Sequence, residues 1–203
     1  MRNLMGVAGM LSWMALPLVA APAAGQSKAP IVLEAARVFT STAERPFLQD
    51  DTLKLMKEKG VYLVPTLFAG EWVGEKVEHF PPAIAAKARA ASAQIQVMFQ
   101  HAVKIGVKVA FGTDSAVEPH GLDAREFALM MRNGMTPAQA LLAATANGAA
   151  LLGLADTIGT LEPGKLADLV AVPGDPLQDI RTTEKVSFVM QGGRIVKSQA
   201  AAH

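Results

Sequence analysis

The chain has 203 residues, of which 51% are hydrophobic and 18% are charged, and its formal net charge is +1. This near-neutral globular composition offers no excess charge for nucleic acid or for an anionic membrane surface, so neither is expected as a partner. The absence of cysteine excludes disulfides, zinc ribbons and thiol catalysis.

The N-terminus has the three-part pattern of a secretory signal peptide. Residues 1–3 include a positive charge, residues 4–19 are almost wholly apolar, and residues 20–25 (AAPAAG) offer small residues for cleavage. An uncleaved membrane anchor is the alternative, but the apolar run is shorter than the ~20 residues that span a bilayer and contains Pro17. We therefore expect residues 1–25 to be cleaved on export, leaving a periplasmic or secreted protein without a membrane segment.

The next segments predict a strand, a helix and a second strand. A strand is expected at 31–40 (IVLEAARVFT), within a segment 26–43. The helix is opened by Asp50-Asp51, carries lysines in its last turn and ends at Gly60. The second strand is expected at 61–68 (VYLVPTLF), near an end or interruption because Pro65 cannot donate a ladder hydrogen bond. A polar loop is expected at 69–80.

A long amphipathic helix is predicted from Pro81-Pro82 to just before Gly106, with one apolar stripe. The stripe consists of Ile84, Ala88, Ala91, Ile95, Met98, Ala102 and Ile105. Residues 107–111 then read as a strand buried on both faces.

Two further helices are expected after this strand. Asp123 and Glu126 resemble a capping arrangement for a helix closed by Gly134. Thr136-Pro137-Ala138-Gln139 is a capping box that opens the next helix, and an apolar helical piece ends near Gly153.

The character of the chain changes from residue 159. Before it, helices and strands alternate as in a parallel α/β architecture. After it, Pro163-Gly164 predicts a type II turn, and Gly192-Gly193 predicts a hairpin between short strands. The C-terminal portion is therefore expected to be a small β module.

Asp114 follows the strand 107–111, where side chains of parallel α/β proteins meet the crevice used for chemistry. Its carboxylate is suited to bind a divalent cation or to accept a proton from a metal-bound water. The alternative is that Asp114 caps a local turn, with Gly112 present only for backbone geometry. His120 lies in the same loop, as a second candidate or as a histidine hydrogen-bonded to backbone.

Other catalytic motifs are missing from the sequence. It contains no glycine-rich phosphate loop, no G-x-S-x-G nucleophile elbow and no H-E-x-x-H. His79, His101 and His203 have no partner at a metal-ligand spacing.

Residues 50 to about 197 resemble the C-terminal half of metal-dependent amidohydrolases, in the imidazolonepropionase-like and Xaa-Pro-dipeptidase-like branch. The resemblance is carried by the following segments: DDTLKLMKEKGVYLVPTL, AVKIGVKVAFGTDSAVEPHGLDAREFALMMRNGMTPAQALLAATANGAALLGL, IGTLEPGKLADLVAVPGDPLQDI and VSFVMQGGRIVK. The strand at 31–40 also resembles the opening strand of that family.

This resemblance implies a (β/α)8 TIM-type barrel with a small β-sandwich-like domain built from both chain ends. Residues 61–68 and 107–111 would be the seventh and eighth barrel strands. Asp114 would be the aspartate that ligates the metal, most often zinc, and carries a proton from the hydrolytic water to the leaving amine, and His120 would contact substrate. The implied domains are as follows: signal peptide 1–25, N-terminal strand 26–43, partial barrel 44–155, β domain 156–198 and a disordered tail 199–203.

The sequence departs from the family at its other metal ligands. The family has an H-x-H after the first strand, often a carboxylated lysine after the fourth, and histidines after the fifth and sixth, and none of these positions exists here. We expect an internal deletion that joins the chain near residues 40–46, with Arg45 roughly where a ligand histidine belongs. One carboxylate cannot hold a catalytic ion, since such sites usually need three protein ligands.

The resemblance implies a hydrolase of carbon–nitrogen bonds, with a small-molecule amide, cyclic amide or dipeptide as substrate. A chain with one ligand is expected to be inactive alone. The alternative is a non-catalytic exported remnant or interaction module. A third reading, a periplasmic small-molecule binding protein, has no specific support in the sequence. Unclosed strand edges are prone to pair with other chains, which leaves a homo-oligomer open.

Overall fold

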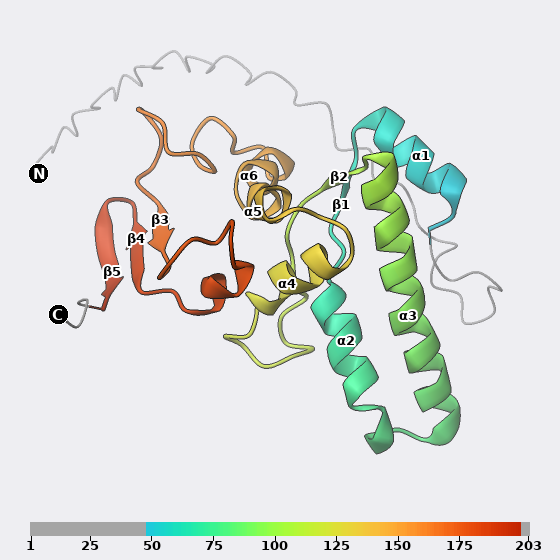
Figure 1. Cartoon of the computed structure of the whole chain (residues 1–203). Coiled ribbons are helices and arrows are strands. Elements are labelled where there is room, and N and C mark those ends of the chain that lie inside the picture. The colour runs from blue at the N-terminus through green and yellow to red at the C-terminus, as the bar shows by residue number, and fades with distance from the viewer. Residues whose placement is uncertain (1–47, 200–203) are drawn as a thin grey trace, which may run out of the picture. The chain divides into compact units, whose positions relative to one another are not determined.

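The computed structural model describes residues 48–199 (Figure 1). In chain order the elements are α1 (Asp50–Lys59), β1 (Tyr62–Leu63), α2 (Leu67–Glu75), the 3-10 helix η1 (Val77–His79), α3 (Pro82–Ile105), β2 (Lys108–Val109), α4 (Arg125–Arg132), α5 (Pro137–Ala144), α6 (Ala146–Leu151), β3 (Leu169–Ala171), the 3-10 helix η2 (Ile180–Glu184), β4 (Phe188–Gln191) and β5 (Arg194–Ser198). β1 and β2 pair in parallel, and β3, β4 and β5 form an antiparallel sheet in that order. The predicted signal peptide, the strand at 31–40 and the join near 40–46 lie outside the described residues, and the domain boundaries stay predictions.

Each of the two parallel strands follows a helix that ends in the same way, at a left-handed glycine. α1 ends at Gly60 and α3 ends at Gly106, with φ angles of 66° and 81° that a residue with a Cβ adopts only at a cost. The next N–H in each case, of Val61 and of Val107, donates to a carbonyl of the preceding helix at 2.8 and 3.0 Å. The helix ends predicted at these glycines are confirmed.

The predicted strand at 61–68 and the predicted loop at 69–80 are both partly wrong. β1 stops after Leu63, and Thr66 takes a left-handed conformation with φ 46°. α2 then begins at Leu67. It contains Gly70 and Gly74, which resemble loop residues in sequence but lie where α2 packs on α3. A Cβ on either glycine would stand 3.5 or 3.3 Å from α3 side chains, so these glycines permit the close approach of the two helices.

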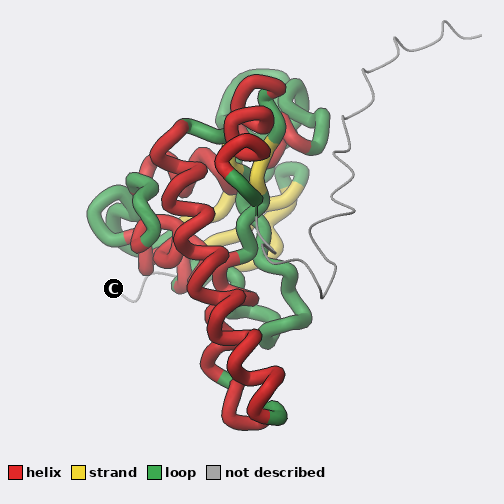
Figure 2. The backbone as a smooth tube through the Cα atoms, turned by 90° about the vertical axis from the view of Figure 1, so that its right-hand side faces the viewer, coloured by secondary structure: helices red, strands yellow, loops and turns green. Residues whose placement is uncertain are grey.

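α3 is the long helix that the sequence predicts, and it lies beside α2 (Figures 1 and 2). Within its predicted stripe Ala102 is fully buried and Ile84 is exposed, while the other members are half-buried. No helix within residues 48–199, α3 included, is long and apolar enough to cross a membrane. The main core cluster comprises Leu53, Met56, Leu63, Leu67, Phe68, Phe99, Ala102, Val107, Val109, Leu129, Met130, Met135, Ala140 and Ala143.

β2 is shorter than predicted and is not buried on both faces. Val107, Val109 and Ala110 are buried, as predicted, but Lys108 is exposed and its Nζ lies 5.3 Å from the ring centroid of Tyr62. Tyr62 is the residue that pairs with Lys108 across the two strands. The parallel arrangement itself is confirmed.

The two predicted helix caps have different outcomes. Thr136 accepts from the N–H of Gln139, whose side chain accepts from the N–H of Thr136, so the capping box of α5 is confirmed. The predicted cap of α4 is wrong, because Ala124 occupies the N-cap position without a side-chain hydrogen bond. Asp123 and Glu126 instead bond to residues elsewhere in the chain.

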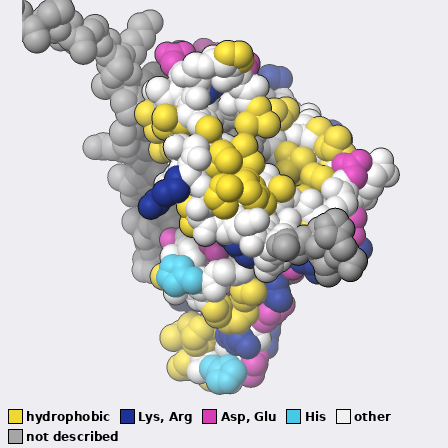
Figure 3. All heavy atoms as spheres, turned by 90° about the vertical axis from the view of Figure 1, so that its left-hand side faces the viewer, with side chains coloured by type: hydrophobic (Ala, Val, Ile, Leu, Met, Phe, Trp, Pro, Cys, Tyr) yellow, Lys and Arg dark blue, Asp and Glu magenta, His cyan; other side chains and the backbone are white. Residues whose placement is uncertain are grey.

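The C-terminal portion is the β module that the sequence predicts. Lys165 N–H donates to Glu162 O at 3.2 Å, and Gly164 has φ 92°, which confirms the Pro-Gly turn. Gly192-Gly193 joins β4 to β5 as predicted. The sheet leaves apolar side chains in water, and such side chains gather in patches on the face shown in Figure 3.

Candidate functional site

The candidate site is the loop 112–124, which follows β2. The end of β2 is fixed from two sides: the N–H of Ala110 donates to Leu63 O, and that of Phe111 donates to Ala143 O, both at 3.0 Å. Gly112 has an ordinary negative or extended φ, so it is not required for backbone geometry as one alternative supposed. A Cβ on Gly112 would lie 2.5 Å from Cγ1 of Val64, so this glycine lets the loops after β1 and β2 approach each other.

Asp114 lies two residues past Gly112, exposed and in a left-handed conformation with φ 59°. Its backbone carbonyl accepts from the N–H of Val117 at 3.2 Å. Within residues 48–199 no hydrogen bond or ion pair of its carboxylate is formed, so this carboxylate does not cap a local turn. The side chain is therefore available to a ligand or a proton.

His120 lies further along the same loop and is also exposed. Its Nδ1 lies 3.0 Å from Oγ of Ser115, a hydrogen bond whose donor depends on the tautomer of the imidazole. The histidine is thus bonded to the residue next to Asp114 through a side chain. The alternative in which it bonds to backbone does not describe this contact.

Asp123 closes the loop rather than capping α4. Its Oδ1 accepts from Oγ1 of Thr113 at 3.0 Å, and its Oδ2 accepts from the N–H of Gly121 at 3.1 Å. Partial burial raises the pKa of Asp123, but these hydrogen bonds outweigh it and hold the pKa below its ordinary value. The charged form of Asp123 therefore ties the two ends of the loop together.

The described residues do not by themselves fit a metal ion. Among residues 48–199 no group of three or more histidine, cysteine, aspartate or glutamate side chains is placed to hold one. Asp114 would supply a single ligand. His101 lies on α3, outside this loop, and its Nε2 is 3.3 Å from Oδ1 of Asp50 without hydrogen-bond geometry.

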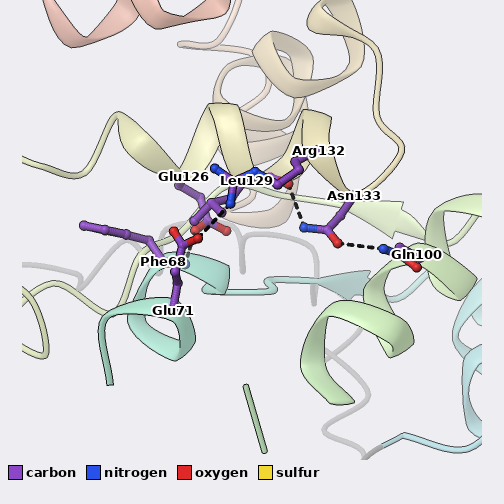
Figure 4. A network of polar contacts seen from close by, with 7 residues as sticks. All are labelled: Phe68, Glu71, Gln100, Glu126, Leu129, Arg132 and Asn133. Atoms are coloured by element: carbon purple, nitrogen blue, oxygen red, sulfur yellow. Dashed lines mark hydrogen bonds and ion pairs between the residues drawn. The ribbon is translucent and has the colours of Figure 1, made fainter. Parts of the chain in front are cut away.

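Two buried glutamates near the site are functional candidates that the sequence does not identify as such, although it offers Glu126 as part of a helix cap. Glu126 accepts from the backbone N–H groups of Leu67 and Phe68, at the start of α2. Figure 4 shows the contact with Phe68. Glu118 is buried within the loop 112–124. The partners of Glu126 are nearly sixty residues away in sequence, so no local pattern could have identified them.

Comparison with known proteins identifies the family. A model of the amidohydrolase family matches residues 27–196. The chain belongs to this family.

Three relatives are informative about this amidohydrolase. A solved Xaa-Pro dipeptidase is 42% identical, with a TM-score of 0.72, over 75% of this chain and 38% of its own. A prolidase solved with N-methylphosphonate-L-proline is 30% identical, with a TM-score of 0.69, over 75% of this chain and 39% of its own. The ochratoxinase of Aspergillus niger is 35% identical over 74% of this chain and 32% of its own length.

The predicted family is therefore confirmed. Its relatives are hydrolases that act on carbon–nitrogen bonds, and the family is generally metal-dependent and built on a TIM barrel. The chain spans 32% to 39% of the length of these three relatives. Residues 48–199 contain a mixed helix and strand portion with one parallel strand pair.

Proposed function

We propose that this chain is the portion of an amidohydrolase that carries the proton-transferring carboxylate, Asp114. The whole enzyme hydrolyses the amide bond of a dipeptide-like small molecule, such as an Xaa-Pro dipeptide. Its β1 and β2 correspond to the last two strands of a TIM-type barrel. The observation that carries this proposal is the exposed, unbonded carboxylate of Asp114 just after β2, in a chain similar to a dipeptidase.

The role of Asp114 follows from the chemistry of amide cleavage. Water must lose a proton to attack the carbonyl carbon, and the departing amine must gain one before the carbon–nitrogen bond breaks. A carboxylate with no internal hydrogen bond can take the first proton and deliver it to the amine nitrogen. His120, positioned through Ser115, is proposed to contact the substrate near this point.

The divalent ion, zinc by expectation, requires ligands beyond those that residues 48–199 offer. We therefore assign no catalytic step to it here. In this proposal the described residues supply Asp114, and the remaining ligands come from the part of the barrel that the relatives have in addition. The enzyme is proposed to work after export, at the location that the N-terminal pattern predicts.

A chimaera tests this proposal. Residues 48–199 replace the matching segment of the solved Xaa-Pro dipeptidase, so that the remaining barrel of that enzyme supplies the missing ligands. We expect the chimaera to hydrolyse Xaa-Pro dipeptides in the presence of zinc or manganese, while the 203-residue chain alone does not. A chimaera that folds, binds metal and shows no turnover would contradict the proposal.

The second candidate is a non-catalytic interaction module. It is favoured by the exposed apolar side chains of the C-terminal sheet, among them Val170 and Val196, which line a hollow of about 590 Å³ away from Asp114. This reading predicts a folded but inactive chimaera, together with binding of another protein by the 203-residue chain.

A further inference from the structure

Two carboxylates are fully buried beside the candidate site. Glu126 on α4 is 0% exposed, and Glu118, in the loop after β2, is 1% exposed. Glu126 Oε1 accepts from Leu67 N at 3.0 Å. Its Oε2 accepts from Phe68 N at 2.7 Å (Figure 4). These N–H groups begin α2 and have no partner within the helix, so α4 holds the first turn of α2 through this one side chain.

Glu118 has no such support. Both of its carboxylate oxygens are buried and lack a hydrogen-bond partner among the described residues. An ionised carboxylate in that environment is strongly unfavourable unless a cation or a proton neutralises it. Glu118 and Glu126, two carboxylates buried near each other, therefore need a cation or a proton between them.

The arginines around the pair already have other partners. Arg132 on α4 pairs with Glu71 of α2 at 2.7 Å, and Arg125 lies 5.7 Å from the ring centroid of Phe68. On the other elements packed against α4, α5 carries no charged side chain and η2 carries only Arg181 and Glu184, both exposed. Arg181 bonds to Asp179.

A proton on Glu126 is then the simplest way to lower the charge of the two glutamates. Burial, and next the neighbouring carboxylates of Glu118 and Glu71, raise the pKa of Glu126 to about 7 against the hydrogen bonds from α2. Glu126 accordingly takes up a proton near neutral pH, although a glutamate in water would not.

We propose that Glu118 and Glu126 form a proton-sensitive clasp that couples the loop after β1 to the loop after β2. With Glu126 protonated, Glu118 stays buried and Glu126 holds the start of α2. When Glu126 is ionised, its repulsion from the carboxylate of Glu118 and its lost hydration favour opening, which releases α2 and the loop that carries Asp114. The clasp concerns loop geometry and stands independently of the catalytic proposal.

Hydrogen exchange of the full chain between pH 5.5 and 8.5 tests the clasp, with exchange corrected for its intrinsic pH dependence. We expect protection of the segments 66–70 and 112–122 to fall together by at least roughly tenfold as the pH rises. Glu118→Gln removes the neighbouring charge without removing a hydrogen bond, so protection at 66–70 should then change much less with pH. Glu78→Gln, at an exposed glutamate, is the matched control and should behave as the unaltered chain.

Three outcomes would overturn the proposal. Protection in the unaltered chain could be independent of pH, or Glu118→Gln could show the same fall as Glu78→Gln. Alternatively, a chelator could abolish protection at pH 6, which would mean that a metal cation, and not a proton on Glu126, offsets the buried negative charge. Glu126→Gln serves as a second variant: if it folds, its protection at 66–70 should be independent of pH.

Discussion

Asp114 occupies a backbone conformation that restricts what can replace it. At φ 59°, aspartate and asparagine are tolerated better than other residues with a Cβ. The sequence placed Asp114 correctly after a strand, because a short apolar run followed by Gly-Thr-Asp marks a strand end. Its left-handed backbone and its free carboxylate depend on the loop as a whole and could not be predicted.

Gly112 should be intolerant of a side chain for a reason of packing. Gly112→Ala places a methyl group 2.5 Å from Cγ1 of Val64, and we expect this to lower the free energy of unfolding by about 1–3 kcal/mol. The measurement is urea unfolding. Adding Val64→Ala should restore most of the loss, and a double variant as unstable as the sum of the two single variants would refute this contact.

The pH dependence of stability should reflect Glu126. Its pKa rises from the ordinary value of 4.5 to about 7 on folding, so the folded state binds the proton more tightly. The contribution of Glu126 to the free energy of unfolding is therefore fully present below about pH 4.5. It is lost as the pH rises through about 7, and the loss is roughly 3 kcal/mol.

Urea unfolding at pH 5 and at pH 8 measures this change. Glu126→Gln should reduce the difference between the two pH values, although it also weakens one hydrogen bond to α2. A Glu126→Gln variant with the same pH dependence as the unaltered chain would show that another group is responsible.

Among the elements, α5 depends on a local cap that the sequence shows openly. Thr136→Ala removes the oxygen that accepts from Gln139 N–H at 3.2 Å, and we expect a loss of about 1 kcal/mol in thermal or urea unfolding. Thr136→Ser keeps this oxygen and should retain most of the stability. Equal losses in both variants would mean that the methyl group of Thr136, not the cap, is stabilising.

Elements whose ends are set by neighbouring residues could be predicted from the sequence. Elements that depend on contacts with residues far along the chain could not. The ends of α1 and α3 follow from single glycines, and the start of α5 follows from four consecutive residues. α2 could not be predicted because its glycines resemble those of a loop. The side chain that accepts from its first N–H groups, Glu126, is also far along the chain. In the sequence, Glu126 resembles a capping residue of α4 because it stands three residues after Asp123.

At the scale of the whole molecule, the exposed apolar side chains predict association. Val170 and Val196 are 63% and 57% exposed on the C-terminal sheet, and β5 is an edge strand. We expect the chain to self-associate in sedimentation experiments and the double change Val170→Lys with Val196→Lys to weaken this at least roughly tenfold.

Val97→Lys is the matched control for this prediction, because Val97 is 65% exposed but lies on α3. If Val97→Lys weakens association as much as the double change, the sheet is not the contact surface. A chain that stays monomeric at all concentrations would contradict the prediction outright.

The most direct test of the central claim is the rate of Xaa-Pro dipeptide hydrolysis by the chimaera with and without the carboxylate of Asp114. Asparagine keeps the size and the left-handed conformation of this residue but cannot carry the proton. We predict that Asp114→Asn lowers kcat/KM by about 10² to 10⁴, whereas Asp156→Asn, at another exposed aspartate, changes it little. An Asp114→Asn chimaera as active as the Asp156→Asn chimaera would contradict the account.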